Sequence, residues 1–112
     1  MANGSAKIAT NLRKGVLEFC VLSVMHADRQ YGVDLSKRLT AAGLIASEGT
    51  LYPLLSRMRA SGLVTTEWVE SDEGRPRRYY EVTAAGREQL AAFRRVWSSL
   101  RDTVDEFLEE SR

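Results

Sequence analysis

The spacing of apolar residues divides the chain into helical and extended segments. Residues 12 to 25, LRKGVLEFCVLSVM, are apolar on nearly all sides after Val16, which predicts a buried helix. A second, shorter helix is predicted up to a stop at Gly43, and Ser47 can cap a third that ends at Gly62. The apolar positions that predict the later helices are Tyr31, Leu35 and Leu39, then Leu51, Leu54, Leu55 and Met58.

After Gly62 the pattern of side chains changes from the period of a helix to the two-residue period of a strand. The segments LVTTEWVE (63 to 70) and RRYYEVT (77 to 83) are rich in β-branched and aromatic residues, and the turn-forming residues 71 to 74 separate them. This pattern predicts a hairpin. Alternation along it places Tyr79 and Tyr80 on opposite faces, so we expect one in the core and the other at its rim.

A long helix is predicted after the hairpin, from Ala84 to Glu110, with Thr83 as its N-cap. At 1.5 Å per residue it would be about 40 Å long. Its apolar residues repeat in heptads and form a seam that needs a partner. The seam consists of Leu90, Phe93, Trp97, Leu100, Val104 and Phe107. Its length favours a homodimer over packing back onto its own domain.

Composition narrows the class of protein. With 112 residues, 44% of them hydrophobic and 28% charged, the chain suits one modest globular core, and residues 1 to about 8 are expected to be poorly ordered. No apolar run is long enough for a membrane span or resembles a signal peptide, so we expect a cytoplasmic protein. The only cysteine, Cys20, and the only histidine, His26, exclude an internal disulfide and the usual zinc sites. No catalytic set, cofactor motif or metal cluster is present, so no enzyme is predicted.

The net charge of +1 conceals an uneven distribution. Residues 1 to 101 carry 15 Lys and Arg against 10 Asp and Glu, a balance of +5, whereas residues 102 to 112 carry 1 against 5, a balance of −4. The body is therefore moderately basic and the tail acidic, which gives limited support to a nucleic-acid partner.

The order helix, helix, helix, strand, strand predicts a mainly α fold with a small β-hairpin, a winged helix-turn-helix over residues 1 to 83. Residues 84 to 112 would form a C-terminal dimerisation helix. Opposite its apolar stripe, the third helix presents small residues that let a backbone approach closely, with polar residues beside them that can reach phosphates or base edges. This face comprises Gly49, Pro53, Ser56 and Ala60, flanked by Thr50, Tyr52 and Arg57. An ordinary amphipathic helix is the alternative.

Two local features bear on this interpretation. Pro53 either lies inside the third helix, where it removes a hydrogen-bond donor, or falls in the first turn of a helix that starts near Thr50. Arg75, Pro76 and Arg77 form a stiffened basic tip that suits a narrow minor groove. The alternative is that the tip is a solvated basic loop. The nearby acidic residues 72 and 73 would oppose phosphate binding.

The motifs GTLYPLLSRM, GRPRRYY and VTAAGREQL, with Tyr31-Gly32 and the segment 61 to 68, resemble the PadR family of bacterial transcriptional regulators, in its compact branch with a single long C-terminal helix. The resemblance implies a homodimeric repressor that binds inverted-repeat operators through the third helix. It also places a set of residues in the DNA-facing region and the wing: Tyr31, Ser47, Gly49, Thr50, Tyr52 and Pro53, with Arg75, Pro76 and Arg77.

Trp97 stands fourteen residues after Thr83, the spacing at which a multidrug-responsive subset of that family places a tryptophan that sandwiches planar aromatic compounds. The resemblance therefore implies an aromatic effector near Phe93, Trp97 and Arg101, although Trp97 also suits packing alone. Arg101 replaces an acidic residue of the subset, which favours a neutral or anionic ligand over a cationic drug. The alternatives are an adaptor that binds a protein rather than DNA, and a small-molecule carrier centred on Trp97.

Overall fold

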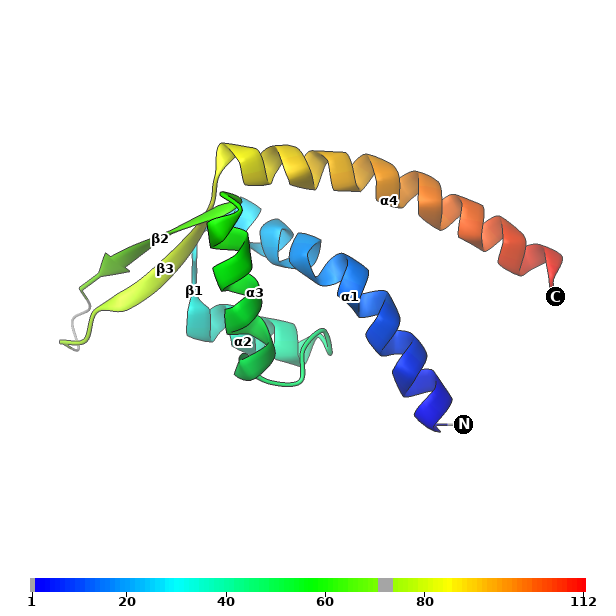
Figure 1. Ribbon diagram of the computed structural model, residues 1–112, viewed down its shortest axis with the longest axis horizontal. Helices are drawn as coiled ribbons and strands as arrows, with labels where there is room; N and C mark the ends of the chain where they lie inside the picture. Colours follow the sequence, from blue (N-terminus) through cyan, green and yellow to red (C-terminus); the bar gives the residue numbers. More distant parts are fainter. Residues whose placement is uncertain (1, 71–73) are drawn as a thin grey trace.

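The computed structural model describes residues 2–70 and 74–112 and contains four helices and three strands in the described ranges (Figure 1). The helices are α1 (Ala2–Ala27), α2 (Gly32–Ala41), α3 (Glu48–Ala60) and α4 (Ala84–Glu110). The strands are β1 (Gln30–Tyr31), β2 (Val64–Val69) and β3 (Arg77–Val82). The winged helix-turn-helix order is confirmed, with one strand more than the sequence predicts.

The extra strand is β1. It pairs with β3 in an antiparallel sheet of order β1-β3-β2, and Tyr31 lies opposite Tyr79. Tyr31 was expected to begin the second helix, which starts instead at Gly32. The predicted hairpin of β2 and β3 is confirmed in register from Val64 opposite Val82 to Val69 opposite Arg77. Most of its predicted turn, residues 71–73, lies outside the described residues.

The core lies where α1, α2, α3 and the sheet meet. The apolar stripe of α3 is buried as predicted, and Tyr80 joins it while Tyr79 is half-buried on the other face of the sheet. In α1 the buried residues are Val21, Leu22 and Met25, which confirms a core helix in this segment. The helix begins about ten residues earlier than its apolar pattern does, at Ala2.

Helix ends follow the predicted signals in most cases. Gly43 and Gly62 follow the C-cap residues of α2 and α3 and adopt positive φ angles of 75° and 78°, a conformation that glycine tolerates best. Thr83 caps α4, because its Oγ1 accepts a hydrogen bond from the Gly86 N–H at 3.1 Å. Ser47 occupies the N-cap position of α3, but its side chain makes no capping hydrogen bond.

Helices α1 and α4 pack against each other near the sheet and then diverge, so both chain termini lie at the end of the molecule away from the hairpin (Figure 1). The outer part of α4 and the first half of α1 carry exposed apolar side chains, among them Ile8, Leu12, Leu100 and Phe107. Within the described ranges, no helix combines the length and apolar character needed to cross a membrane.

Candidate nucleic-acid interface

The outward face of α3 is exposed along its whole length. Gly49, Thr50, Pro53, Ser56 and Arg57 are all exposed, while the opposite stripe is buried. Pro53 lies inside the helix, which starts at Glu48, so the first of the two predicted alternatives is confirmed. A regular helix with small exposed residues leaves its backbone accessible to a docking surface.

Tyr52 connects this face to α2. Its ring lies so close to Gly32 that a Cβ at Gly32 would stand 3.1 Å from both Cε1 and the hydroxyl oxygen of Tyr52. Partial burial raises the pKa of the Tyr52 phenol above its ordinary value, and the electrostatic influences of Glu48 and Tyr80 each add a smaller increase. The hydroxyl therefore stays protonated at neutral pH and can donate a hydrogen bond to a phosphate or a base edge.

The base of the wing is an aromatic and cationic stack. The rings of Tyr31 and Tyr79 stack with centroids 3.7 Å apart. The Arg77 guanidinium lies 4.9 Å from the Tyr31 centroid, and that of Arg29 lies 4.2 Å from the Tyr79 centroid. Arg29 also pairs with Glu67 at 3.5 Å. The predicted DNA-facing residue Tyr31 thus contacts the wing directly, and Arg77, like its exposed neighbours Arg75 and Pro76, lies at the accessible end of β3.

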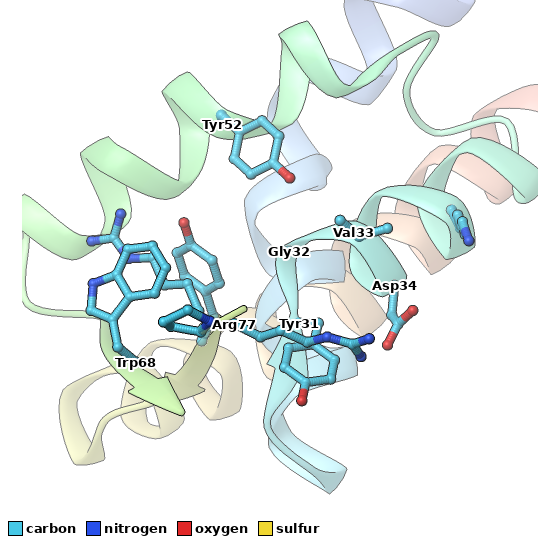
Figure 2. A pocket seen from close by; sticks show the side chains of 11 residues that line it. Tyr31, Gly32, Val33, Asp34, Tyr52, Trp68 and Arg77 are labelled. Carbon is cyan, nitrogen blue, oxygen red and sulfur yellow. The ribbon is translucent and has the colours of Figure 1, made fainter. Parts of the chain in front are cut away.

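A hollow of about 640 Å³, called here the wing hollow, separates the start of α2 from the wing. Figure 2 shows Tyr52 on α3 above the first turn of α2, with Trp68 on the wing side and Arg77 beside Tyr31. Predicted site residues Tyr31, Tyr52, Pro76 and Arg77 are therefore brought together. Lys37, Trp68 and Arg78 also line the hollow and were missed. The alternation of β2 from Val64 places Trp68 on the same face as the core, a signal that would have identified it.

The heptad seam of α4 is largely exposed, but its first residue is not. Leu90 is 3% exposed in the core of its own chain, so the surface offered to a partner does not include it. Phe93 is half-buried and stacks on Phe19 of α1 at 4.2 Å. From there outward Leu100 is 53% exposed and Phe107 is 67% exposed, with Trp97 and Val104 also exposed. Such a contiguous apolar surface is typical of an interaction site.

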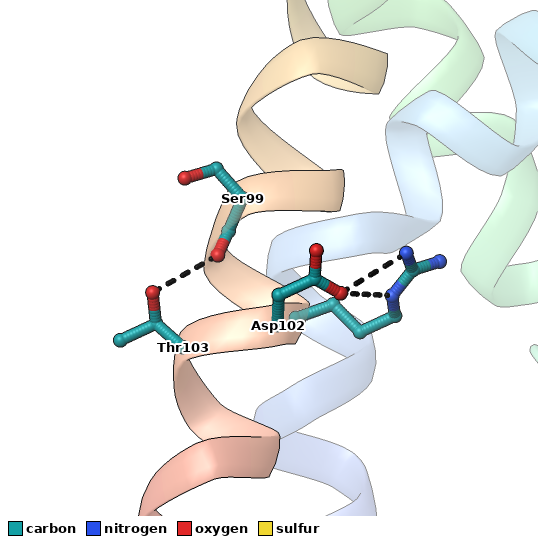
Figure 3. Close-up of polar contacts among 4 residues, drawn as sticks. Ser99, Asp102 and Thr103 are labelled. Carbon is teal, nitrogen blue, oxygen red and sulfur yellow. Dashed lines mark hydrogen bonds and ion pairs between the residues drawn. The ribbon is translucent and has the colours of Figure 1, made fainter.

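A groove of about 650 Å³ lies between α1 and α4, called here the interhelix groove. Phe93 and Trp97 line it, and their rings stack with centroids 5.9 Å apart and an interplanar angle of 13°. Arg101 does not line the groove. Its guanidinium pairs with Asp102, with an Nη2 to Oδ1 distance of 3.2 Å. Figure 3 shows Asp102 next to Thr103, whose hydroxyl donates to the Ser99 carbonyl. Asp102 therefore offsets part of the positive charge expected from Arg101.

Over residues 2–70 and 74–112, no three His, Cys, Asp or Glu side chains gather in a group suited to a metal ion. What the site offers instead is an exposed small-residue face on α3 and a cationic wing, with Tyr52 of α3 and Arg77 of the wing lining one hollow. This arrangement fits a binding surface for an extended polyanion.

Comparisons with known proteins agree with this geometry. The model of the transcriptional regulator PadR-like family matches residues 21–92. Transcriptional regulator Rv3488 from Mycobacterium tuberculosis is 42% identical over 86 residues, which cover 74% of this chain and 79% of that protein.

Solved structures show the same relationship. A PadR-like transcriptional regulator from Bacillus cereus superposes with a TM-score of 0.80 at 38% identity, covering 88% of this chain and 96% of the other. A padr family transcriptional regulator from Eggerthella lenta reaches a TM-score of 0.85 at 33% identity, with 96% and 95% covered. The matched segment, the sequence identities and the shared fold show that the chain belongs to the PadR-like family of transcriptional regulators.

Proposed function

We propose that this transcriptional regulator is a dimeric repressor that binds an inverted-repeat operator in the cytoplasm. The observation that carries the proposal is that Tyr52, at the exposed face of α3, and Arg77 of the wing line one hollow. A helix in the major groove and a wing in the adjacent minor groove would use both sides of that hollow. Residues 1–83 then act as the DNA-binding head.

Dimerisation falls to residues 84–112, because the outer part of α4 is exposed in the described structure. Val104 and Phe107 lie far from the core and remain exposed. Two copies that bury these seams against each other would hold two heads at a fixed separation, roughly one helical turn of DNA or about 34 Å between successive major grooves.

Binding to the DNA upstream of the chain's own gene tests the repressor directly. We expect fluorescence polarisation to show sequence-specific binding by a dimer. Replacing both Arg75 and Arg77 with Ala should weaken binding to all sequences and reduce the slope of log affinity against log salt by up to about two per head. Arg95→Ala, on an exposed part of α4, removes charge away from the proposed interface and is the control. A folded dimer with no sequence preference at low and moderate salt would contradict the repressor and favour the adaptor.

The proposed effector is a planar aromatic compound that stacks on Trp97 at the seam. Support comes from the stacked rings of Phe93 and Trp97, which line the interhelix groove and leave Trp97 exposed. Release would follow if the compound binds better to a dimer geometry that no longer fits the operator.

Titration of aromatic compounds against tryptophan fluorescence tests this site, with Trp97→Ala separating its signal from that of Trp68. We expect the substitution to abolish the fluorescence response and the ligand-induced release of DNA. Ligand binding of equal affinity in Trp97→Ala would instead assign Trp97 to packing.

A further inference from the structure

The face of the wing that continues the core ends in an arginine. On paired strands β2 and β3, one face carries Val64 opposite Val82, then Thr66 opposite Tyr80, then Trp68 opposite Arg78. Val64 and Tyr80 are buried, whereas Trp68 is 65% exposed. Arg78 and Trp68 therefore form the solvent end of the sheet face that packs on α3.

Among the described residues, the Arg78 guanidinium is held in place by a hydroxyl and two rings and by no carboxylate. Its Nη2 donates to Thr66 Oγ1 at 3.2 Å, and its carbon lies 5.7 Å from the Trp68 ring centroid and 5.5 Å from that of Tyr80. Its Nε is buried and has no acceptor among the described residues. A buried donor without an acceptor is rare in proteins, and an ordered water or a bound group usually completes its hydrogen bonding.

Arg78 also stands between two hollows. Arg78 and Tyr80 line both the wing hollow and a second hollow of about 280 Å³ against the C-terminal half of α3. The second hollow, called here the Arg59 hollow, is lined by Leu55, Ser56, Arg59, Ala60, Arg78 and Tyr80. These described lining residues include two arginines, the hydroxyls of Ser56 and Tyr80, and no carboxylate, so the hollow favours an anion.

We propose that Arg78, with Arg59 and the Ser56 hydroxyl across the hollow, receives a phosphate of the DNA backbone, while Trp68 packs against the adjoining sugar. The inference rests on the proposed DNA binding and adds to it a contact that lies between helix and wing. One sugar-phosphate strand separates a major groove from the neighbouring minor groove, so it must cross the surface between α3 and the wing. Arg78 lies on that surface, and phosphate oxygens supply the acceptors that its planar donors need.

The contact should position the duplex without reading its sequence. We therefore expect Arg78→Gln to weaken binding roughly tenfold to hundredfold, equally for the operator and for scrambled DNA. The slope of log affinity against log salt should fall by about two for a dimer that loses two phosphate contacts. Arg78→Lys, which keeps the charge, should retain most of the slope. Arg95→Gln is again the matched control, and circular dichroism and sedimentation check folding and assembly.

Arg59→Gln removes a positive charge from the α3 side of the same hollow and does not alter the sheet. It therefore tests the proposed contact even if Arg78→Gln does not fold. It should also flatten the salt slope. Unchanged affinity and slope in Arg59→Gln and in every folded Arg78 variant would overturn the proposal, while operator binding by the unaltered chain would leave the repressor intact. No binding by the unaltered chain would instead reject both.

Trp68 reports whether the anion is DNA or free phosphate. In a Trp97→Phe background, operator DNA should change Trp68 emission saturably, and Arg78→Gln should shift the midpoint of that change to roughly tenfold to hundredfold higher DNA concentration. Sodium phosphate compared with sodium chloride at equal ionic strength should give no saturable response. Saturation by inorganic phosphate, with the Arg78 variants binding DNA normally, would show a free-anion site and overturn the backbone contact.

Discussion

Gly86 occupies the junction between the sheet and α4, where no side chain fits. A Cβ at this position would overlap the Leu63 carbonyl oxygen and stand 2.6 Å from Val82 Cγ2. The carbonyl cannot easily retreat, because it accepts the Thr83 N–H at 3.0 Å, and Thr83 in turn donates to the Gly62 carbonyl. The glycine is therefore required by close backbone approach rather than by an unusual φ angle.

Gly86→Ala should reduce the free energy of unfolding by about 1 to 3 kcal/mol, because steric overlap outweighs the helix propensity gained. Gly4→Ala is the control, since a Cβ there meets nothing within 4 Å, and it should be neutral or stabilise by at most about 1 kcal/mol. Urea denaturation of both variants measures the difference. Equal stabilities would show that the junction relaxes without cost.

Cys20 is half-buried on α1, and burial raises the pKa of its thiol above the ordinary value. Because only the thiolate reacts, we expect the native protein to react with a disulfide reagent at pH 8 at least about tenfold more slowly than the urea-unfolded chain. The native rate should rise as the pH increases toward the raised pKa. Equal rates in native and unfolded protein would mean that the thiol is neither buried nor shifted.

At the scale of elements, α3 contains Pro53 in its interior, where a proline destabilises a helix. It lies in the second turn, where a residue with an N–H would donate to the Gly49 carbonyl. Buried Leu51, Leu54 and Leu55 nevertheless hold the helix against the core. Tertiary packing therefore maintains a helix that its local sequence disfavours.

Pro53→Ala should restore that hydrogen bond and raise the free energy of unfolding by about 1 to 3 kcal/mol. Ser56→Ala, on the same exposed face, should change it by no more than about 0.5 kcal/mol. Thermal and urea unfolding compare the two variants. A Pro53→Ala protein no more stable than the unaltered chain would show that α3 is already relaxed around the proline.

Elements with strong periodicity could be predicted from sequence, and those without it could not. The predicted bounds of the last helix, Ala84 to Glu110, are those of α4, since a cap and a heptad pattern define them. Strand β1 has two residues, too few for a period to register, so pairing with β3 determines it. Arg78 was missed because its importance depends on the register opposite Trp68 and on hollows that only the fold creates.

The whole molecule is elongated and its projecting ends carry opposite charge. Its radius of gyration is 16.5 Å, against about 13 Å for a compact domain of this length. The first half of α1 bears Lys7, Arg13 and Lys14, whereas the last turns of α4 are acidic from Asp102 onward. Both ends are exposed and diverge from each other (Figure 1).

The proposed dimer predicts how this extended shape responds to a seam mutation. Leu100→Asp should leave the stability of the single chain nearly unchanged, because the side chain is exposed there, but it should place an unpaired charge in the interface. We expect the dimer dissociation constant to rise at least about 100-fold and operator affinity to fall with it. Arg95→Asp on the outer face of α4 is the control for added negative charge. A Leu100→Asp dimer of unchanged affinity, by analytical ultracentrifugation, would place the interface elsewhere.

Because Leu63 and Val82 pack closely against Gly86, the rotation of α4 about its axis is fixed relative to the DNA-binding head. In the proposed dimer, each residue inserted between Gly86 and the seam would turn the head by about 100° around the helix axis and move it 1.5 Å outward. One added residue would therefore put the two heads out of phase with the turns of DNA. Seven added residues would nearly restore the angle, within about 20°, but lengthen each arm by about 10 Å. If the proposed dimer binds an inverted repeat, the number of residues between Gly86 and the seam would set the helical phase of the operator half-sites.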